Sequence, residues 1–135
     1  MGLFNRSKAE PAGTTTTLQV PDELASKARV EYGNARFAAA ASLYSEAVDK
    51  LHTMYVVGQC RYRQPSASDA PITEGLASAV GAALAMDSSV PVRSLIEKST
   101  HYLGEILQMP QAASVSNTYQ AALAELSRLY GTASN

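Results

Sequence analysis

The chain has no tryptophan, only two phenylalanines and a single cysteine among its 135 residues. Aromatic residues make up 7% of the sequence and hydrophobic residues 46%, and much of the apolar content is alanine. Alanine is the best helix former, but its side chain fills little core volume. We therefore expect closely packed helices with thin side-chain layers, and no thick aromatic core.

The single cysteine, Cys60, excludes a disulfide bond within the chain. A reducing compartment would leave such a pattern, so we expect a cytoplasmic protein, although an odd cysteine leaves a bridge between two chains open. Neither His52 nor His101 stands with Cys60 in a recognisable nucleophile motif. We expect Cys60 to be a small buried side chain at a helix end.

An excess of charge of one sign is also missing. The net charge is −1, with 17% charged residues, which gives no electrostatic footprint for nucleic acid or anionic lipid. No apolar run approaches the length of a membrane-spanning helix. The glycines are scattered, without the G-x-G-x-x-G or G-x-x-x-x-G-K patterns that cradle phosphates. We expect a soluble protein that is not an enzyme and has no cofactor, nucleic-acid partner or membrane partner.

Apolar residues recur every three to four positions, and no segment alternates with a period of two, which predicts an all-α fold. We expect a flexible N-terminal tail over residues 1–19, one helical domain over 20–131 and a short tail over 132–135. The domain is predicted to be an antiparallel bundle of five helices. Caps and breaks place them at about residues 20–33, 35–60, 71–86, 90–109 and 117–131.

The second of these helices is unusually long and has an apolar face along its whole length from Phe37 to Cys60. At about 1.5 Å per residue it would reach roughly 36 Å. We expect Arg61 and Arg63 to complement the dipole at its end. The part after His52 needs cover from later helices or from another molecule. The apolar face consists of Phe37, Ala40, Ala41, Tyr44, Ala47, Val48, Leu51, Met54, Tyr55 and Gly58.

Aromatic and small residues alternate at the start of this helix, at Phe37, Ala40, Tyr44 and Ala47. With Tyr32 ahead of them, the stretch VEYGNARFAAAASLYSEAV resembles one tetratricopeptide repeat, a helix-turn-helix unit, and Ala40 and Tyr44 match its A-x₃-F pattern. The resemblance covers about residues 21–52. A microtubule-interacting-and-trafficking domain, a three-helix bundle, is similar over the same span.

The chain departs from the repeat pattern at several positions. Ala35 stands where the repeat usually has a glycine before the turn's basic-aromatic pair, and His52 stands where a proline normally closes the second helix. The W-x₂-L-G-x₂-Y positions of the first helix are Leu24, Lys27, Ala28 and Glu31. A lone repeat cannot bury both of its faces, so the other three helices or a second subunit must cover it.

The resemblance implies a protein–protein interaction module in which the inner face of the first helix binds a peptide or helical partner. It places Asp22, Arg29 and Tyr32 on that face. The alternative is a structural homo-oligomer or homodimer whose seam is the far end of the long helix. That seam would include Leu43, Met54, Val57 and Tyr62. The candidate partner-binding residues are therefore six: Asp22, Arg29, Tyr32, Met54, Val57 and Tyr62.

A third hypothesis is a small metal- or ligand-binding bundle that uses His52 or His101. Glu97, His101 and Glu105 share one helix face because they lie four apart, and this spacing fits either a metal site or a solvated face. Asp49 and His52 lie three apart, but the Glu-x-x-His pairs of di-iron bundles are missing. We expect no metal at either position.

Overall fold

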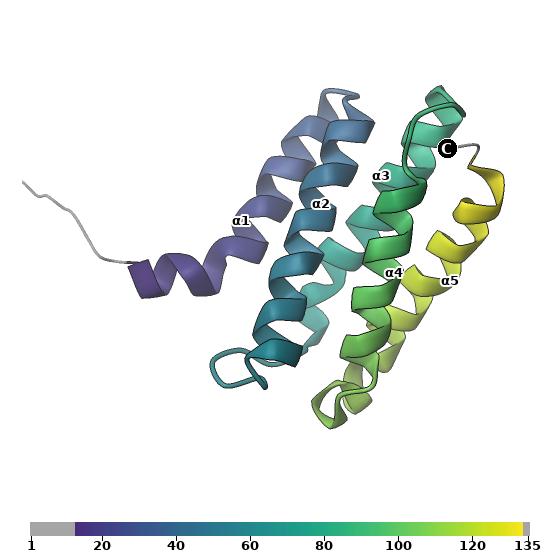
Figure 1. Ribbon diagram of the computed structural model, residues 1–135. Helices are drawn as coiled ribbons and strands as arrows, with labels where there is room; N and C mark the ends of the chain where they lie inside the picture. The colour runs from purple at the N-terminus through teal and green to yellow at the C-terminus, as the bar shows by residue number, and fades with distance from the viewer. Residues whose placement is uncertain (1–12, 134–135) are drawn as a thin grey trace, which may run out of the picture.

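Five α-helices and no strand make up the part of the chain that the structure, a computed structural model, describes, which is residues 13–133. This confirms the all-α fold. Successive helices run in opposite directions, as expected for an antiparallel bundle (Figure 1). The helices are α1 (Gly13–Gly33), α2 (Phe37–His52), α3 (Ala70–Met86), α4 (Arg93–Leu107) and α5 (Ser116–Thr132).

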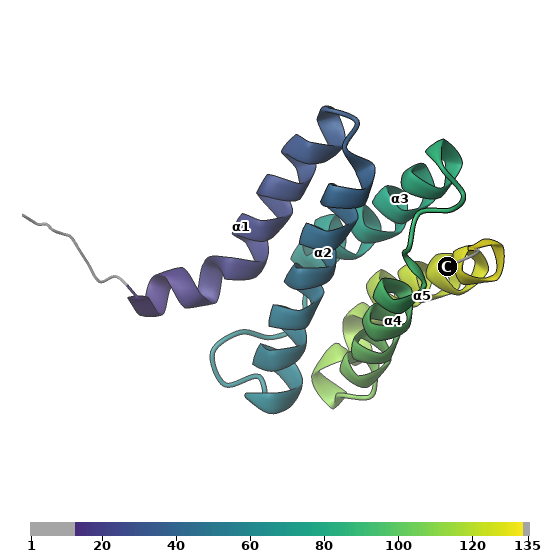
Figure 2. The same cartoon turned by 45° about the horizontal axis from the view of Figure 1, so that its top comes forward.

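Four of the helices form a ring, and the fifth lies outside it. α2 packs against α3 and α4, and α5 closes the ring on the opposite side by packing against the same two helices (Figure 2). α1 packs mainly on α2 and also touches α3. The core between the ring helices is apolar, and its largest fully buried side chains include Leu51, Ile72, Leu76, Ile96, Leu103, Ile106 and Leu126.

The first helix begins earlier than the sequence indicated. Its first residue is Gly13, not Val20, so residues 13–19 of the expected tail lie in a helix, and residues 1–12 lie outside the described residues. Pro21 lies inside this helix. A proline there removes a backbone donor and bends the helix. The ribbon of α1 is indeed bent, and its first turns project away from the other helices (Figures 1 and 2).

The second helix ends earlier than expected. The α-helical part of this segment ends at His52. The chain then forms one π-helical turn, Thr53–Val57, in which the Gly58 amide donates to the Thr53 carbonyl at 2.8 Å. The prediction of a continuous α-helix as far as Cys60 is therefore wrong for the residues after His52. Gln59 and Cys60 then take left-handed backbone angles and turn the chain back. Cys60 is buried, as predicted, and burial raises the pKa of its thiol.

The last three helices lie where the periodicity placed them. The inner face of α3 is buried and consists of Ile72, Leu76, Ala79, Val80, Ala83 and Leu84. Two short 3₁₀ turns, Ala67–Asp69 and Pro110–Val115, occur in segments expected to be loops. α4 begins after Val92, and the Ser89 hydroxyl ahead of it donates to Asp87.

The turn between α1 and α2 forces a residue into the left-handed region. The expected break at Gly33 and Asn34 is correct for the helix end, but the positive φ falls on Ala35, at 61°. The methyl group of an L-residue crowds the backbone in this region, whereas glycine does not. An ion pair from Arg36 to Glu31, 2.5 Å long, closes the turn.

Replacement of Ala35 by glycine should stabilise the fold. The relieved strain exceeds the entropy that a glycine loses on folding, so Ala35→Gly should raise the free energy of unfolding by about 0.5–1 kcal/mol. Urea unfolding monitored by circular dichroism measures the difference. Asn34→Gly is the control: its φ is not positive, so it should bring no gain. Equal effects of the two substitutions would contradict this account of the turn.

Candidate functional site

A shallow groove runs where α1, α2 and α3 meet. Its lining comes from Arg29 and Tyr32 on α1, Tyr44 on α2, and Gly75 and Ser78 on α3. Arg29 and Tyr32 lie three apart in sequence and therefore share a face of α1. The structure brings together these two of the six residues that the sequence proposed for partner binding.

The floor of the groove is a contact between Tyr44 and Gly75. A methyl group placed on Gly75 would lie 2.4 Å from the Tyr44 ring, so only glycine leaves room for this ring on α3. Tyr44 is 5% exposed. The sequence predicted that Tyr44 packs between helices, but it did not identify Gly75 and Ser78 as groove residues. The available signal was a glycine inside a helix, which often marks the close approach of another side chain or backbone.

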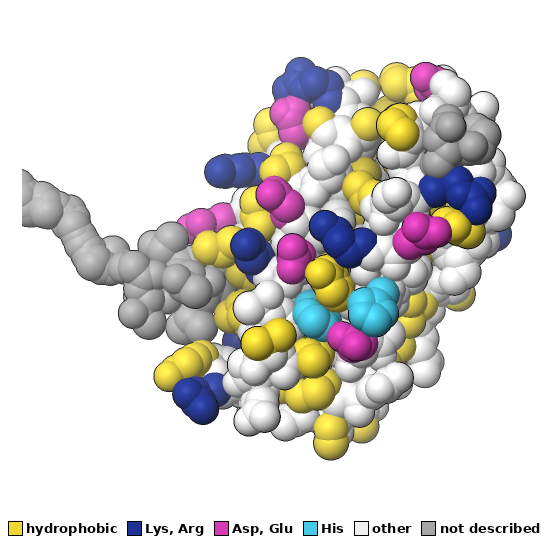
Figure 3. All heavy atoms as spheres, viewed as in Figure 1, with side chains coloured by type: hydrophobic (Ala, Val, Ile, Leu, Met, Phe, Trp, Pro, Cys, Tyr) yellow, Lys and Arg dark blue, Asp and Glu magenta, His cyan; other side chains and the backbone are white. Residues whose placement is uncertain are grey.

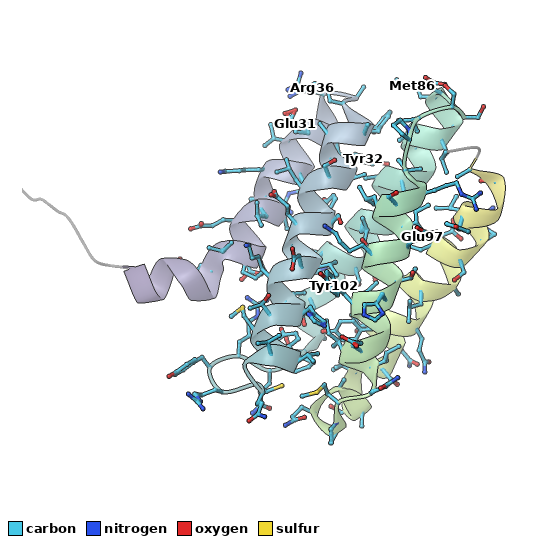
Figure 4. All side chains as sticks on the ribbon, viewed as in Figure 1. Glu31, Tyr32, Arg36, Met86, Glu97 and Tyr102 are labelled. Carbon is cyan, nitrogen blue, oxygen red and sulfur yellow. The ribbon has the colours of Figure 1, made fainter. Side chains whose placement is uncertain are left out.

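Arg29 supplies the positive charge of the groove. The pKa of the Tyr44 hydroxyl is raised, mainly by burial and to a smaller extent by Tyr32, while the positive charge of Arg29 acts to lower it. Tyr32 is 38% exposed and packs edge-on against the Phe37 ring, with 5.0 Å between the ring centroids. Figure 4 shows Tyr32 near the α1–α2 turn, at the same end of the molecule as Met86.

The other four proposed residues lie elsewhere. Asp22 accepts two hydrogen bonds from Arg63, at 3.0 and 3.1 Å, and so forms an ion pair within the chain. Met54 and Val57 lie in the π-helical turn and Tyr62 in the loop after it, at the opposite end of the hairpin from Tyr32. Val57 is 70% and Tyr62 74% exposed. The six residues therefore do not form one site.

A buried carboxylate, Asp69, holds this far end together. It is fully buried and accepts hydrogen bonds from the hydroxyls of Tyr55, at 2.9 Å, and Tyr119. The Ser66 amide also donates to it, at 3.3 Å. The sequence reasoning missed this cluster, although S-x-x-D at Ser66 to Asp69, just before α3, matches the capping-box pattern that the structure contains.

Arg63 links the cluster to α1. Its guanidinium donates to Asp69 at 3.0 Å, to the Tyr55 hydroxyl at 3.0 Å and to Asp22. Burial acts to lower the pKa of Arg63, but the hydrogen bonds to Asp22 and Asp69 outweigh it and raise that pKa. Burial, together with the Asp69 charge, raises the pKa of Tyr55. Arg63 was expected to complement the helix dipole, and the structure instead gives it these side-chain partners.

The two histidines meet on one carboxylate between α2 and α4. His52 lies 2.5 Å and His101 3.5 Å from the two oxygens of Glu105, and both histidines are visible side by side in Figure 3 (cyan). His52 also stacks on Tyr102, with 4.2 Å between ring centroids. Glu97 is not part of this group, because it accepts a hydrogen bond from Tyr130. Within residues 13–133, no group of three or more His, Cys, Asp and Glu side chains is arranged to hold a metal ion.

Loss of the Asp69 carboxylate should destabilise the fold strongly. Asp69→Ala removes the acceptor of two buried hydroxyls and one of the partners of the Arg63 guanidinium, and should lower the free energy of unfolding by about 3–5 kcal/mol. Chemical denaturation measures the loss. Asp49→Ala is the matched control, because the Asp49 side chain makes no hydrogen bond within residues 13–133, and it should change stability by less than about 0.5 kcal/mol. A small loss in Asp69→Ala would show that the cluster is not a structural centre.

The Glu105 pairing should make stability depend on pH. The hydrogen bond from His52 holds the pKa of Glu105 below its usual range, with His101 adding to the effect. Because the folded-state pKa is the lower of the two, the ionised Glu105 carboxylate stabilises the fold at pH values above the unfolded-state pKa, about 4.3 for glutamate. This stabilisation is lost as the pH falls through the folded-state pKa. Glu105→Gln should therefore flatten the fall in melting temperature on acidification. Glu46→Gln, on the exposed face of α2, should leave the slope as it is; equal slopes in parent and Glu105→Gln would contradict the prediction.

Comparison with known proteins identified no relative of the chain. A scan against protein-family models, a search of curated proteins and a search of solved structures each found no match to the chain. The tetratricopeptide-like and microtubule-interacting-and-trafficking-like resemblances of residues 21–52 therefore stay predictions. Of the helices described here, none is long and apolar enough to cross a membrane.

Proposed function

We propose that the protein is a cytoplasmic, non-enzymatic interaction module that binds a peptide or helical protein partner in the groove between α1 and α3. The observation that carries the proposal is that Arg29 and Tyr32 converge there over the buried ring of Tyr44. Arginine and tyrosine are frequent anchors at protein interfaces, because they combine a rigid apolar surface with hydrogen-bond donors.

The size and chemistry of the groove favour a protein partner. Its volume is about 270 Å³, below the roughly 300–1,000 Å³ of most small-molecule sites. The groove is lined by helix faces and lacks a pair of facing acid and base groups for catalysis. A groove of this kind suits one or two side chains of a longer partner, whose remaining contacts would lie along the helices.

Self-association is the second candidate function. Val57 and Tyr62 are among the most exposed large apolar side chains of the described chain. Met54 lies in the same π-helical turn as Val57 and packs, partly buried, against the core. Contiguous exposed apolar patches mark contact surfaces. We propose this far end of the hairpin as the seam if the protein forms a homodimer.

Two matched double substitutions test the groove against the far end. Arg29→Ala with Tyr32→Ala should abolish capture of partner proteins by the immobilised chain, because it removes the cation and the exposed ring of the groove. Arg61→Ala with Tyr62→Ala removes the same two residue types at the other end and should leave capture unchanged. Quantitative mass spectrometry of the bound fraction compares the two.

Light scattering and thermal melts on the same variants complete the test. Both double variants should keep the parent's melting temperature, because all four side chains contact solvent. A parent dimer that becomes a monomer only in the Arg61 and Tyr62 variant would favour self-association at the far end. Unchanged capture by the Arg29 and Tyr32 variant would rule out the groove as the binding surface.

A further inference from the structure

The groove contains a buried side chain whose polar atom has no partner. Tyr44 is 5% exposed, yet within residues 13–133 its hydroxyl makes no hydrogen bond. Buried hydroxyls are nearly always hydrogen-bonded, because a missing bond leaves the cost of desolvation uncompensated. The Tyr44 ring is held in place against Gly75, so its hydroxyl stays at the groove that it lines. A ligand in the groove would supply the missing bond.

The Arg29 guanidinium lines the same groove and forms no ion pair with a carboxylate of the described residues. Arg36, Arg63 and Arg128 each form an ion pair with a carboxylate. Arg29 has no such partner in the described chain, although its charge acts on the Tyr44 hydroxyl. The guanidinium and the hydroxyl therefore give the lining of one groove two kinds of hydrogen-bond donor.

The rest of the lining also consists of donors. Tyr32 and Ser78 contribute hydroxyls, Gly75 contributes no side chain, and none of the five lining residues is acidic. With one positive charge and no negative charge, such a site favours an anion over a cation. The planar fork of one arginine matches the two oxygens of a carboxylate, whereas a phosphate dianion is usually held by more than one positive charge.

We infer that Arg29 and Tyr44 form a carboxylate subsite, which receives an acidic side chain or the terminal carboxylate of a peptide partner. The inference rests on the proposed function, since it names the chemistry of the partner in the same groove. Arg29 binds the carboxylate from the exposed side, and the Tyr44 hydroxyl donates to it from the floor. Tyr32 and Ser78 border the position on either helix.

Defined peptides test the inference by nuclear magnetic resonance titration of the full chain. The probes are a short glutamate peptide with an amidated C-terminus, a neutral glycine-serine peptide with a free C-terminus, the same neutral peptide amidated, and inorganic phosphate. At least one carboxylate probe should shift the Arg29 side-chain signal and the Gly75 and Ser78 amide signals. The probe that does so identifies the source of the carboxylate. The amidated neutral peptide should shift none of them.

Three single substitutions assign the binding to the two residues. Tyr44→Phe removes the hydroxyl but keeps the ring against Gly75, so the fold and its melting temperature should be preserved. Arg29→Gln removes the charge. Each should weaken binding of the carboxylate probe about tenfold, as expected for a hydrogen bond to a charged group. Arg61→Gln, at the far end, should leave binding unchanged.

Three results would overturn the inference: no shift with either carboxylate probe, tighter binding of phosphate than of both, or binding by Tyr44→Phe and Arg29→Gln equal to the parent. Each is distinguishable from failure of the proposed function. If the Arg29 and Tyr32 double variant loses its partner proteins while no carboxylate probe binds, the groove is a binding surface but not a carboxylate site.

Discussion

A single buried carboxylate connects most of this molecule. Asp69 accepts hydrogen bonds from Tyr55 in the π-helical turn, from Tyr119 on α5 and from Arg63 in the loop between α2 and α3. Arg63 extends the network to Asp22 on α1. A fully buried carboxylate is tolerated only where such partners satisfy it. The loop after α2 folds back onto this carboxylate through Arg63, and α4 packs against the π-helical turn that a lone hairpin would leave uncovered.

The position of α1 matters because α1 forms one wall of the groove. Its buried face offers Pro21, Ala25 and Ala28, and alanine side chains bury little area, about 1 kcal/mol or less each. Burial alone holds this helix weakly compared with the leucine-rich ring helices. Two polar contacts add to it, the pair of Asp22 with Arg63 near the middle of α1 and the pair of Glu31 with Arg36 at its C-terminal end. The groove residues Arg29 and Tyr32 lie on the C-terminal half of this helix.

The sequence predicted the helical elements well because their signal is local. The period of apolar residues in α3, α4 and α5 and the prolines near their ends were enough to place them within a few residues. The placement of Arg29 and Tyr32 on one face of the first helix was implied by the resemblance to a tetratricopeptide repeat. The start of α1 was missed because Pro21 indicated a first turn, whereas the chain accepts it inside a bent helix. The end of α2 was missed because the π-helical turn has no local signal of its own.

The sequence by itself determined the all-α fold, the antiparallel order of five helices and which face of each is apolar, since side chains three or four apart on one helix must share a face. Only the tertiary structure decided how polar residues pair. Asp22 and Arg63 are 41 positions apart and Asp69 and Tyr119 are 50 apart, and no periodicity relates such positions. The contact of Tyr44 with Gly75, which leaves a hydroxyl and a free arginine in one groove, likewise exists only once α1, α2 and α3 have packed together.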